Sequence, residues 1–364
     1  MKNISIITTV LLFSGFSGAN AYDAHIYANN ITAHNIITIQ HTITNTALSS
    51  FGGSMATGLG KTATKIEPFD PQSSEDPKTT YGHAPVYGTE PLYGEYNADG
   101  RSGGDMLNPD AMLTAAWLNW HHGRDYANFD NATRYLSNTD IFTFGISGGQ
   151  TKLWNGTSKW GMYAGYVGGS QKDSEIKLTE NGGFFGIYNG NKFGNLNVYA
   201  ILNGGVLNNS ADTTFGTDEF TNFWLSGMVR TTYAIALDDT FSLVPGLNIG
   251  YTWIKSEDYT SASGDILTND SFGTFEISPS LHAIKHIGNG WHGSLSVAYV
   301  MNTGDGGDIS TGGTQIAPPQ VDDFIEYGIS LEKSVMGFTF TGNFGRRDGG
   351  RDGWIGGLNI KYAF

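Results

Sequence analysis

Apolar and polar residues alternate strictly over the last stretch of the chain, from Gly353 to Phe364. One parity carries Trp354, Gly356, Leu358, Ile360, Tyr362 and Phe364, and the other carries Gly357, Asn359, Lys361 and Ala363. Alternation with a period of two predicts a β-strand with one apolar face and one polar face. The terminal aromatic residue belongs to the apolar face, so we expect the end of the chain to be part of an ordered strand rather than frayed.

The same alternation returns from about residue 140 onward. Residues 241–253, 291–302 and 325–332 each place most of their apolar side chains on one parity and their polar side chains on the other, where the charges of Glu326 and Glu332 also fall. We therefore predict about twelve strands, near residues 116–123, 140–150, 159–169, 181–190, 193–206, 219–236, 239–254, 271–286, 290–302, 322–333, 336–346 and 352–364. The fourth segment is ambiguous in parity and the first is the weakest. Pro245 falls inside a strand and predicts a β-bulge, because it has no N–H for the ladder.

Short and long connections alternate between these segments. The short ones are residues 190–194, 237–240, 286–290 and 333–337, and the long polar ones are residues 170–181, 208–219, 255–271 and 303–322. Tight turns at one rim and long loops at the other are typical of transmembrane β-barrels. A soluble β-sandwich also alternates, but its strands usually hold five or six residues. Alternation over ten or more residues favours strands that cross a bilayer at a tilt.

The N-terminus has the features of a secretory signal peptide over residues 1–21. Lys2 precedes an apolar run from Ile4 to Phe16, and Ala19 and Ala21 form a cleavage site of the A-x-A type. The mature chain is therefore expected to begin at Tyr22, outside the cytoplasm. After the signal, no run of 18 apolar residues predicts a membrane-spanning helix.

Composition narrows the chemistry. The chain has 51 glycines, 18 tyrosines, 21 phenylalanines and only 15% charged residues, which fits amphipathic strands and many turns. Its net charge of -14 argues against nucleic acid as a partner. The absence of cysteine excludes disulfides and thiolate metal sites. No common catalytic or phosphate-binding motif is present, and the histidines lack a carboxylate at metal-ligand spacing, so we expect no catalytic site, cofactor or metal.

Residues 22–107 are interpreted as a short passenger or linker segment, partly disordered, ahead of a barrel over residues 108–364. Residues 31–51 are rich in Thr and Ile, which favours extended structure over a helix without deciding between them. Tyr-Gly pairs at 81, 87 and 93 indicate a semi-rigid linker or a tyrosine-lined binding segment. Asn108 and Pro109 could begin a helix that enters the barrel, although the same stretch could simply start the first strand.

The chain ending resembles that of outer-membrane barrels of Gram-negative bacteria, in which alternating apolar positions and a final aromatic residue form a signal for the barrel assembly machinery. The matching residues are Leu358, Ile360, Tyr362 and Phe364. The last strand must also pair with the first, because an open sheet edge is not tolerated in lipid. We expect Phe364 to close this seam at the periplasmic rim.

The resemblance extends over the final ~250 residues to the translocator domain of autotransporters, the type V secretion proteins. It is carried by `SGGQT` at 147–151, `GMYAGYVGGSQ` at 161–171, `GGFFGIYNGNKFGNLNVYAILNGG` at 182–205 and the `KYAF` ending. It implies an outer-membrane barrel, surrounded by lipid, that passes and displays a short N-terminal segment at the cell surface. A porin-like channel with a periplasmic or plugging N-terminal segment is the alternative. An outer-membrane hydrolase is disfavoured, because His292, Ser294 and Asn302 fall on the lumen parity rather than the lipid parity.

Parity also sends five charged residues into the lumen: Arg230, Glu276, Glu326, Glu332 and Lys361. Ionised groups in such a space need water or partners. They are expected either to neutralise one another or to line a path and hold a plug. A twelve-stranded barrel leaves room for about one helix, about 10 to 12 Å across.

Overall fold

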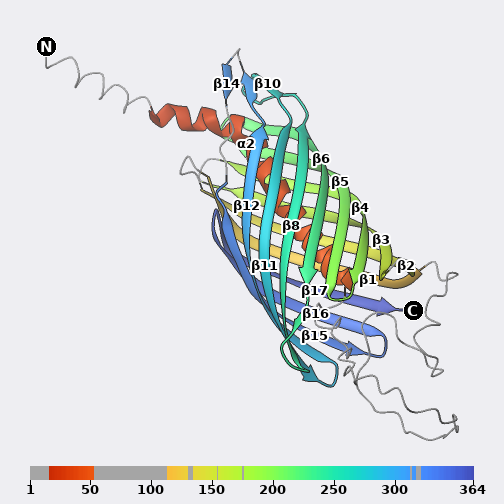
Figure 1. The fold of residues 1–364 in the computed structure, drawn as a ribbon. Coiled ribbons are helices and arrows are strands. Elements are labelled where there is room, and N and C mark those ends of the chain that lie inside the picture. The colour runs from red at the N-terminus through yellow and green to blue at the C-terminus, as the bar shows by residue number, and fades with distance from the viewer. Residues whose placement is uncertain are drawn as a thin grey trace, which may run out of the picture.

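The chain forms a long N-terminal helix inside a closed β-barrel (Figure 1). A computed structural model describes residues 16–52, 113–129, 134–153, 155–173, 176–311, 314–316 and 321–364. The barrel strands are β1 (Leu113–Asn128), β2 (Arg134–Leu153), β3 (Gly156–Lys172), β4 (Lys177–Phe193), β5 (Leu196–Thr213), β6 (Gly216–Tyr233), β8 (Phe241–Ser256), β11 (Phe272–Gly288), β12 (Trp291–Gly306), β15 (Phe324–Val335), β16 (Phe338–Gly349) and β17 (Arg351–Ala363).

Each barrel strand pairs antiparallel with the next, and β17 pairs with β1 to close the wall. The predicted twelve-stranded antiparallel barrel is therefore confirmed. At the seam Ala115 lies opposite Ala363 and Ala127 opposite Arg351. Closure leaves no open strand edge in the wall, which is the condition for a sheet to cross lipid.

Short turns lie at one rim of the barrel and longer connections at the other, as the sequence predicts. The extent of two of the long loops differs from the prediction. Two of the predicted long loops, residues 170–181 and 208–219, are mostly strand, because β3, β4, β5 and β6 extend as hairpins well past the apolar positions. The other two long connections carry the short strands β9 (Tyr259–Thr260), β10 (Ile266–Asn269), β13 (Ile309–Thr311) and β14 (Thr314–Ile316), which form a small sheet beyond the rim. We call the rim that carries these long connections the outer rim, since long loops face the cell exterior in such barrels.

Tight turns close the opposite rim, which also holds the C-terminus and is the periplasmic rim. Asn289 and Met336 adopt positive φ values of 51° and 50° in two of these turns. In a third turn the backbone N–H and the hydroxyl of Thr240 donate to Asp238, and this lowers the pKa of the Asp238 carboxyl. Short turns that satisfy their own polar groups keep this rim compact.

The predicted bulge at Pro245 is wrong. The ladder between β6 and β8 stops at Thr232 opposite Gly246, and the short strand β7 (Ile235–Ala236) resumes it at Ile235 opposite Leu243. The register is the same on both sides of the interruption. The missing proline N–H is therefore accommodated by a break in the neighbouring strand instead of an extra residue.

The helix α2 (Phe16–Gly52) decides the alternatives that the sequence left open for residues 31–51, which are helical although their Thr and Ile content favours extended structure. The reason is tertiary: a single segment inside the lumen has no strand to pair with, and a helix satisfies its own backbone groups. Leu113 already belongs to β1, so residues 113–116 are strand and not helix. Residues 108–112 and the Tyr-Gly repeat lie outside the described residues. No helix among the described ranges has both the length and the hydropathy to cross a membrane.

Candidate functional site: the helix-filled lumen

The helix passes through the barrel from the outer rim toward the periplasmic rim. Near its N-terminal end, Ala28 and Ile31 are buried in an apolar cluster with Phe129 and Phe220, which lie near the outer ends of their strands. Near its C-terminal end, Asn359 of β17 donates a hydrogen bond of 2.6 Å to the Ser50 hydroxyl. The direction of α2 is therefore N-terminus outward and C-terminus toward the periplasm, as Figure 1 also shows.

One side of the helix is packed as a protein core. Ile36, Ile39 and Ile43 are at most 1% exposed and belong to one cluster with barrel aromatics that include Trp117 and Trp224. Burying each isoleucine contributes roughly 1.5–3 kcal/mol. The helix lies closest to β1, β2, β4, β5, β6 and β8, one half of the wall, and polar side chains of β11, β16 and β17 reach it from the other half. Along the other half, lumen-facing Ser294, Ser296, Ser330 and Asn343 keep solvent exposure.

The other side of the helix meets a chain of buried ion pairs. Arg347 bonds to Asp125 at 3.0 Å and to Glu326 at 2.9 Å, and Arg351 bonds to the second oxygen of Asp125 at 3.1 Å. Arg347 also donates to the Thr42 hydroxyl at 3.3 Å, which joins the wall to the helix. Two guanidinium groups sharing one carboxylate leave spare donors, and the helix supplies acceptors for them.

Two further polar contacts hold the lower and middle helix. His41 lies 2.9 Å from a Glu276 carboxylate oxygen through its Nδ1, and Asn45 approaches its Nε2 at 2.9 Å. Asn45 in turn accepts from Arg230 at 3.2 Å. The pairs fix the helix in rotation as well as in depth, because each polar side chain has a partner on a different strand.

Asn35 provides a polar side-chain contact in the outer half of the helix. Its amide donates to Glu180 at 2.6 Å, while its oxygen accepts from Ser137 at 3.3 Å and Arg351 at 3.4 Å. Gln171 donates to the other Glu180 oxygen. Glu180 is 1% exposed, so its hydrogen bonds offset the cost of burying a carboxyl group beside the helix.

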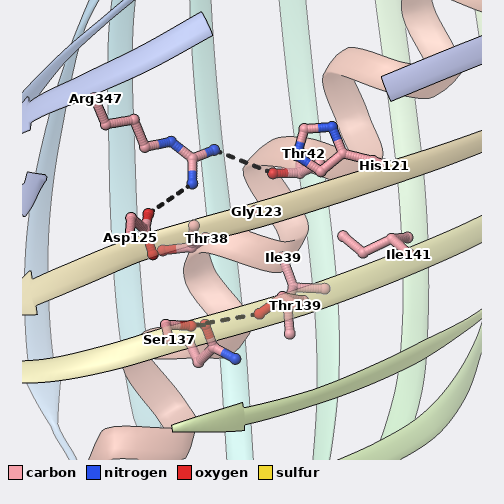
Figure 2. A pocket seen from close by; sticks show the side chains of 11 residues that line it. Thr38, Ile39, Thr42, His121, Gly123, Asp125, Ser137, Thr139, Ile141 and Arg347 are labelled. Carbon is pink, nitrogen blue, oxygen red and sulfur yellow. Dashed lines mark hydrogen bonds and ion pairs between the residues drawn. The ribbon is translucent and has the colours of Figure 1, made fainter. Parts of the chain in front are cut away.

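A small cavity remains between the helix and strands β1 and β2, shown in Figure 2. Thr38, Thr42, His121, Asp125 and Arg347 are among its lining residues. Its volume of about 10 Å³ is room for about one water molecule. At this place the helix packs against the wall and leaves no room for a larger ligand.

The structure places all five predicted lumen charges inside the barrel. Arg230, Glu276 and Glu326 meet the helix network directly or through Arg347. Glu332 and Lys361 lie in the periplasmic half of the lumen, where Thr341 donates to Glu332 at 3.2 Å. The five residues therefore fall into a group of three in the helix network and a pair in the periplasmic half of the lumen.

The sequence reasoning missed four charged residues of the barrel wall that belong to this network: Asp125, Glu180, Arg347 and Arg351. Each falls just outside a predicted strand or, for Glu180, in a supposed loop before the segment of ambiguous parity. If the predicted strands had been extended by a few residues, their alternation would have placed all four side chains on the face toward the lumen.

The predicted assembly signal lies on the outer face of β17. Leu358, Ile360 and Tyr362 are 57%, 40% and 39% exposed, and Phe364 is 72% exposed. Ala19 and Ala21 of the predicted cleavage site fall within the first turns of α2. Cleavage after Ala21 would leave the buried part of the helix, from Ala28 onward, intact.

The histidine constellation is not arranged for nucleophilic catalysis. His292 bonds to His286 at 2.8 Å, whereas Ser294 bonds to Ser330 at 2.6 Å. A nucleophile needs its base within hydrogen-bond reach, and here the serine is engaged elsewhere. Within the described residues, no group of three or more acidic or histidine side chains could hold a metal ion.

The family model of the autotransporter beta-domain matches residues 116–348, from β1 to β16. The transport unit of the autotransporter AIDA-I from Escherichia coli is similar with a TM-score of 0.60 at 14% identity, over 71% of this chain and 92% of that chain. The translocator domain of autotransporter NalP from Neisseria meningitidis gives 0.59 at 11% identity, over 72% and 92%. The beta domain of the Bordetella autotransporter Brka gives 0.56 at 13% identity, over 70% and 100%.

Among curated proteins, none matches this chain. The structural likenesses establish the fold, and the match over residues 116–348 establishes the family. That family comprises secretion barrels of the Gram-negative outer membrane rather than enzymes. With its closed barrel of twelve strands, the chain belongs to the autotransporter beta-domain family.

Proposed function

We propose that this translocator has its own N-terminal helix as its main cargo, and that it retains the helix in the lumen after passage. The observation that carries the proposal is the direction of α2, with Ala28 at the outer rim and Ser50 hydrogen-bonded in the periplasmic half. A chain threaded in this direction presents its N-terminal end at the cell surface. The displayed part is then short, and the helix closes the pore that it crossed.

The same geometry divides the remaining N-terminal residues between compartments. The helix ends at Gly52 in the periplasmic half, and β1 begins at Leu113 on the periplasmic rim. The connection over residues 53–112 thus starts and ends on the same side of the membrane. We assign that connection to the periplasm, so the surface segment stops at the start of the helix.

The proposal includes two partners. Outer-membrane lipid surrounds the apolar outer face, on which Leu247, Val297 and Ile329 are exposed. The barrel assembly machinery reads the C-terminal strand, whose apolar positions also face outward. Both partners follow from which side chains the barrel presents to its surroundings.

Single cysteines can test the topology, because the chain has none of its own. Cysteine would replace Asp23 before the buried helix and Ser73 in the connection. Ala262 in an outer loop and Asp239 in a periplasmic turn are matched exposed controls. A membrane-impermeant maleimide is added to intact cells and to permeabilised cells.

We expect Asp23→Cys to be labelled in intact cells, like Ala262→Cys. Ser73→Cys should be labelled only after permeabilisation, like Asp239→Cys. Labelling of Ser73→Cys in intact cells would show that the connection itself is displayed. Protection of Asp23→Cys in intact cells would instead support a periplasmic plug in a channel-like barrel.

A further inference from the structure

Three arginines lie together on the outside of the wall at the outer rim. Arg124 of β1, Arg134 of β2 and Arg346 of β16 all have the parity opposite to the lumen-facing residues. Around the seam, Arg124 is the cross-strand partner of Trp354, and Trp354 is the partner of Arg346. We call these three residues the arginine cluster.

The cluster stands at the upper end of the apolar belt. On β1 the outward residue Trp120 is 37% exposed, and on β16 the outward residue Phe344 is 53% exposed. Arg346 is the next outward residue after Phe344, and Arg124 lies two outward positions beyond Trp120. A ligand in contact with the cluster can therefore lay apolar chains along the same wall.

Aromatic rings position two of the guanidinium groups. Arg134 lies 4.0 Å from the centre of the Tyr126 ring, and Arg346 lies 5.0 Å from the centre of the Trp354 ring. Trp354 itself stacks on Phe344 at 5.1 Å. Guanidinium groups over aromatic faces are held in place while their edges stay available to hydrogen-bond acceptors.

Carboxylates satisfy only part of the donor capacity. Arg346 donates to Asp348 at 2.8 Å and to Asp352 at 2.9 Å, and Arg134 shares Asp352 at 3.1 Å. Each guanidinium has five N–H donors, so several remain. Among the described residues, Arg124 is exposed and has no ion-pair partner. The nearby outward carboxylate of Asp140 on β2 is engaged by Trp120 at 3.0 Å and His122 at 3.1 Å, so it leaves the Arg124 guanidinium unpaired.

The opposite part of the wall has the reverse character. The outward residues near the outer ends of β5 and β6 include Asp212 and Glu219. Within these two strands, the one basic residue is Arg230, and it faces the lumen. The outward face at the outer ends of β5 and β6 therefore lacks basic residues, whereas basic outward residues extend from the arginine cluster to Lys172 of β3 and Lys177 of β4.

We propose that the arginine cluster binds the phosphate groups of an anionic lipid in the outer leaflet. Phosphate matches the guanidinium fork, and a lipid phosphate arrives at this height with acyl chains for the belt below. Arg124 contributes a free guanidinium edge, and Arg134 and Arg346 contribute the donors that Asp348 and Asp352 do not use. The lipid would cover the seam between β1 and β17 from outside.

The test uses the folded full-length barrel in neutral detergent and measures lipid retention by native mass spectrometry. The probes are a bisphosphorylated lipid A, its dephosphorylated form and inorganic phosphate. The variants are Arg124→Gln, which breaks no ion pair, and Arg124→Gln with Arg346→Gln. The control is Lys285→Gln with Lys333→Gln, which removes two cations beside aromatic rings at the periplasmic rim.

We expect Arg124→Gln to weaken binding of the phosphorylated lipid about tenfold, and the double variant to weaken it further. The control variant should bind as the unmodified protein does. Equal binding by the arginine variants, or equal binding of the dephosphorylated lipid, would overturn the proposal. Binding of inorganic phosphate as tight as that of the lipid would show an anion site that does not recognise lipid. A heat-modifiable gel shift confirms that each variant is folded.

Discussion

Arg347 and Asp125 form an ion pair of 3.0 Å in the lumen, and both side chains are less than 5% exposed. They come from strands β16 and β1, on either side of β17, so the pair spans the seam of the barrel. Arg351 of β17 joins the same carboxylate, and Arg347 reaches the helix at Thr42. The contacts that close the wall are thus the contacts that seat the helix.

Removing the shared carboxylate should destabilise the barrel strongly. Asp125→Asn leaves two buried guanidinium groups with less compensation, and breaking a buried pair typically costs about 3–5 kcal/mol. Asp352→Asn, which breaks exposed pairs with Arg134 and Arg346, should cost less than about 1 kcal/mol. The measurement is urea unfolding of the refolded protein, followed by tryptophan fluorescence. Similar midpoints for the two variants would contradict a structural role for the buried network.

Disrupting the helix contacts should open the lumen. Ile36→Asp with Ile43→Asp places two unpaired carboxyl groups in the apolar cluster, where burial of a charge is unfavourable. Asn343→Asp also adds a carboxyl group inside the barrel, but at an exposed position. In planar bilayers we expect steady ion conductance from the double isoleucine variant and a closed barrel from Asn343→Asp. Equal conductance of the two would mean that the helix does not seal the pore.

Lysine scanning separates the two faces of the wall. Leu247 and Val297 are 38% and 44% exposed on the outer face, so lysine there should cost about 2–4 kcal/mol if the residue lies near the bilayer midplane. Lysine at Ser296, which faces the open side of the lumen, should be tolerated. Folding yields in lipid vesicles give the comparison, and equal yields would contradict the assigned faces.

Asn248 is a second lumen-facing position for lysine, and the structure predicts a different result there than at Ser296. Asn248 also faces inward, but it is 2% exposed because the helix lies near β8. Parity alone would treat Asn248 and Ser296 as equivalent sites for lysine. The position of the helix makes Asn248→Lys unfavourable, and the difference between the two sites reports on which half of the lumen is filled.

The strands could be predicted from sequence because lipid outside and water or helix inside impose a strict period of two. Strand ends were less accessible, since polar residues beyond the belt alternate without an apolar signal. That is why residues 170–181 read as a loop and Glu180 was missed. The helix could not be predicted for another reason. Ile and Thr at positions 36–44 lower the helix propensity, and it is packing inside the barrel that stabilises the helix.

The last residue separates assembly from stability. The ladder between β17 and β1 ends at Ala363 opposite Ala115, so Phe364 lies beyond it, 72% exposed. Among the aromatic side chains that the structure describes, the Phe364 ring contacts only that of Tyr362, edge to face at 5.4 Å. The prediction that Phe364 closes the seam is therefore wrong, because the ladder to β1 ends at Ala363. The exposed Phe364 side chain is accessible for binding by another protein.

Deleting Phe364 should change the free energy of unfolding of the refolded barrel in detergent by no more than about 0.5 kcal/mol relative to the unmodified protein. Changes at exposed positions usually have effects of this size. In cells, the same deletion should sharply reduce the folded barrel in isolated outer membranes, measured by the heat-modifiable gel shift. Lys361→Gln, three residues earlier on the lumen face, should assemble nearly normally. Loss of stability in vitro would make Phe364 a structural residue. Normal assembly in cells would remove the basis for an assembly signal at Leu358, Ile360, Tyr362 and Phe364.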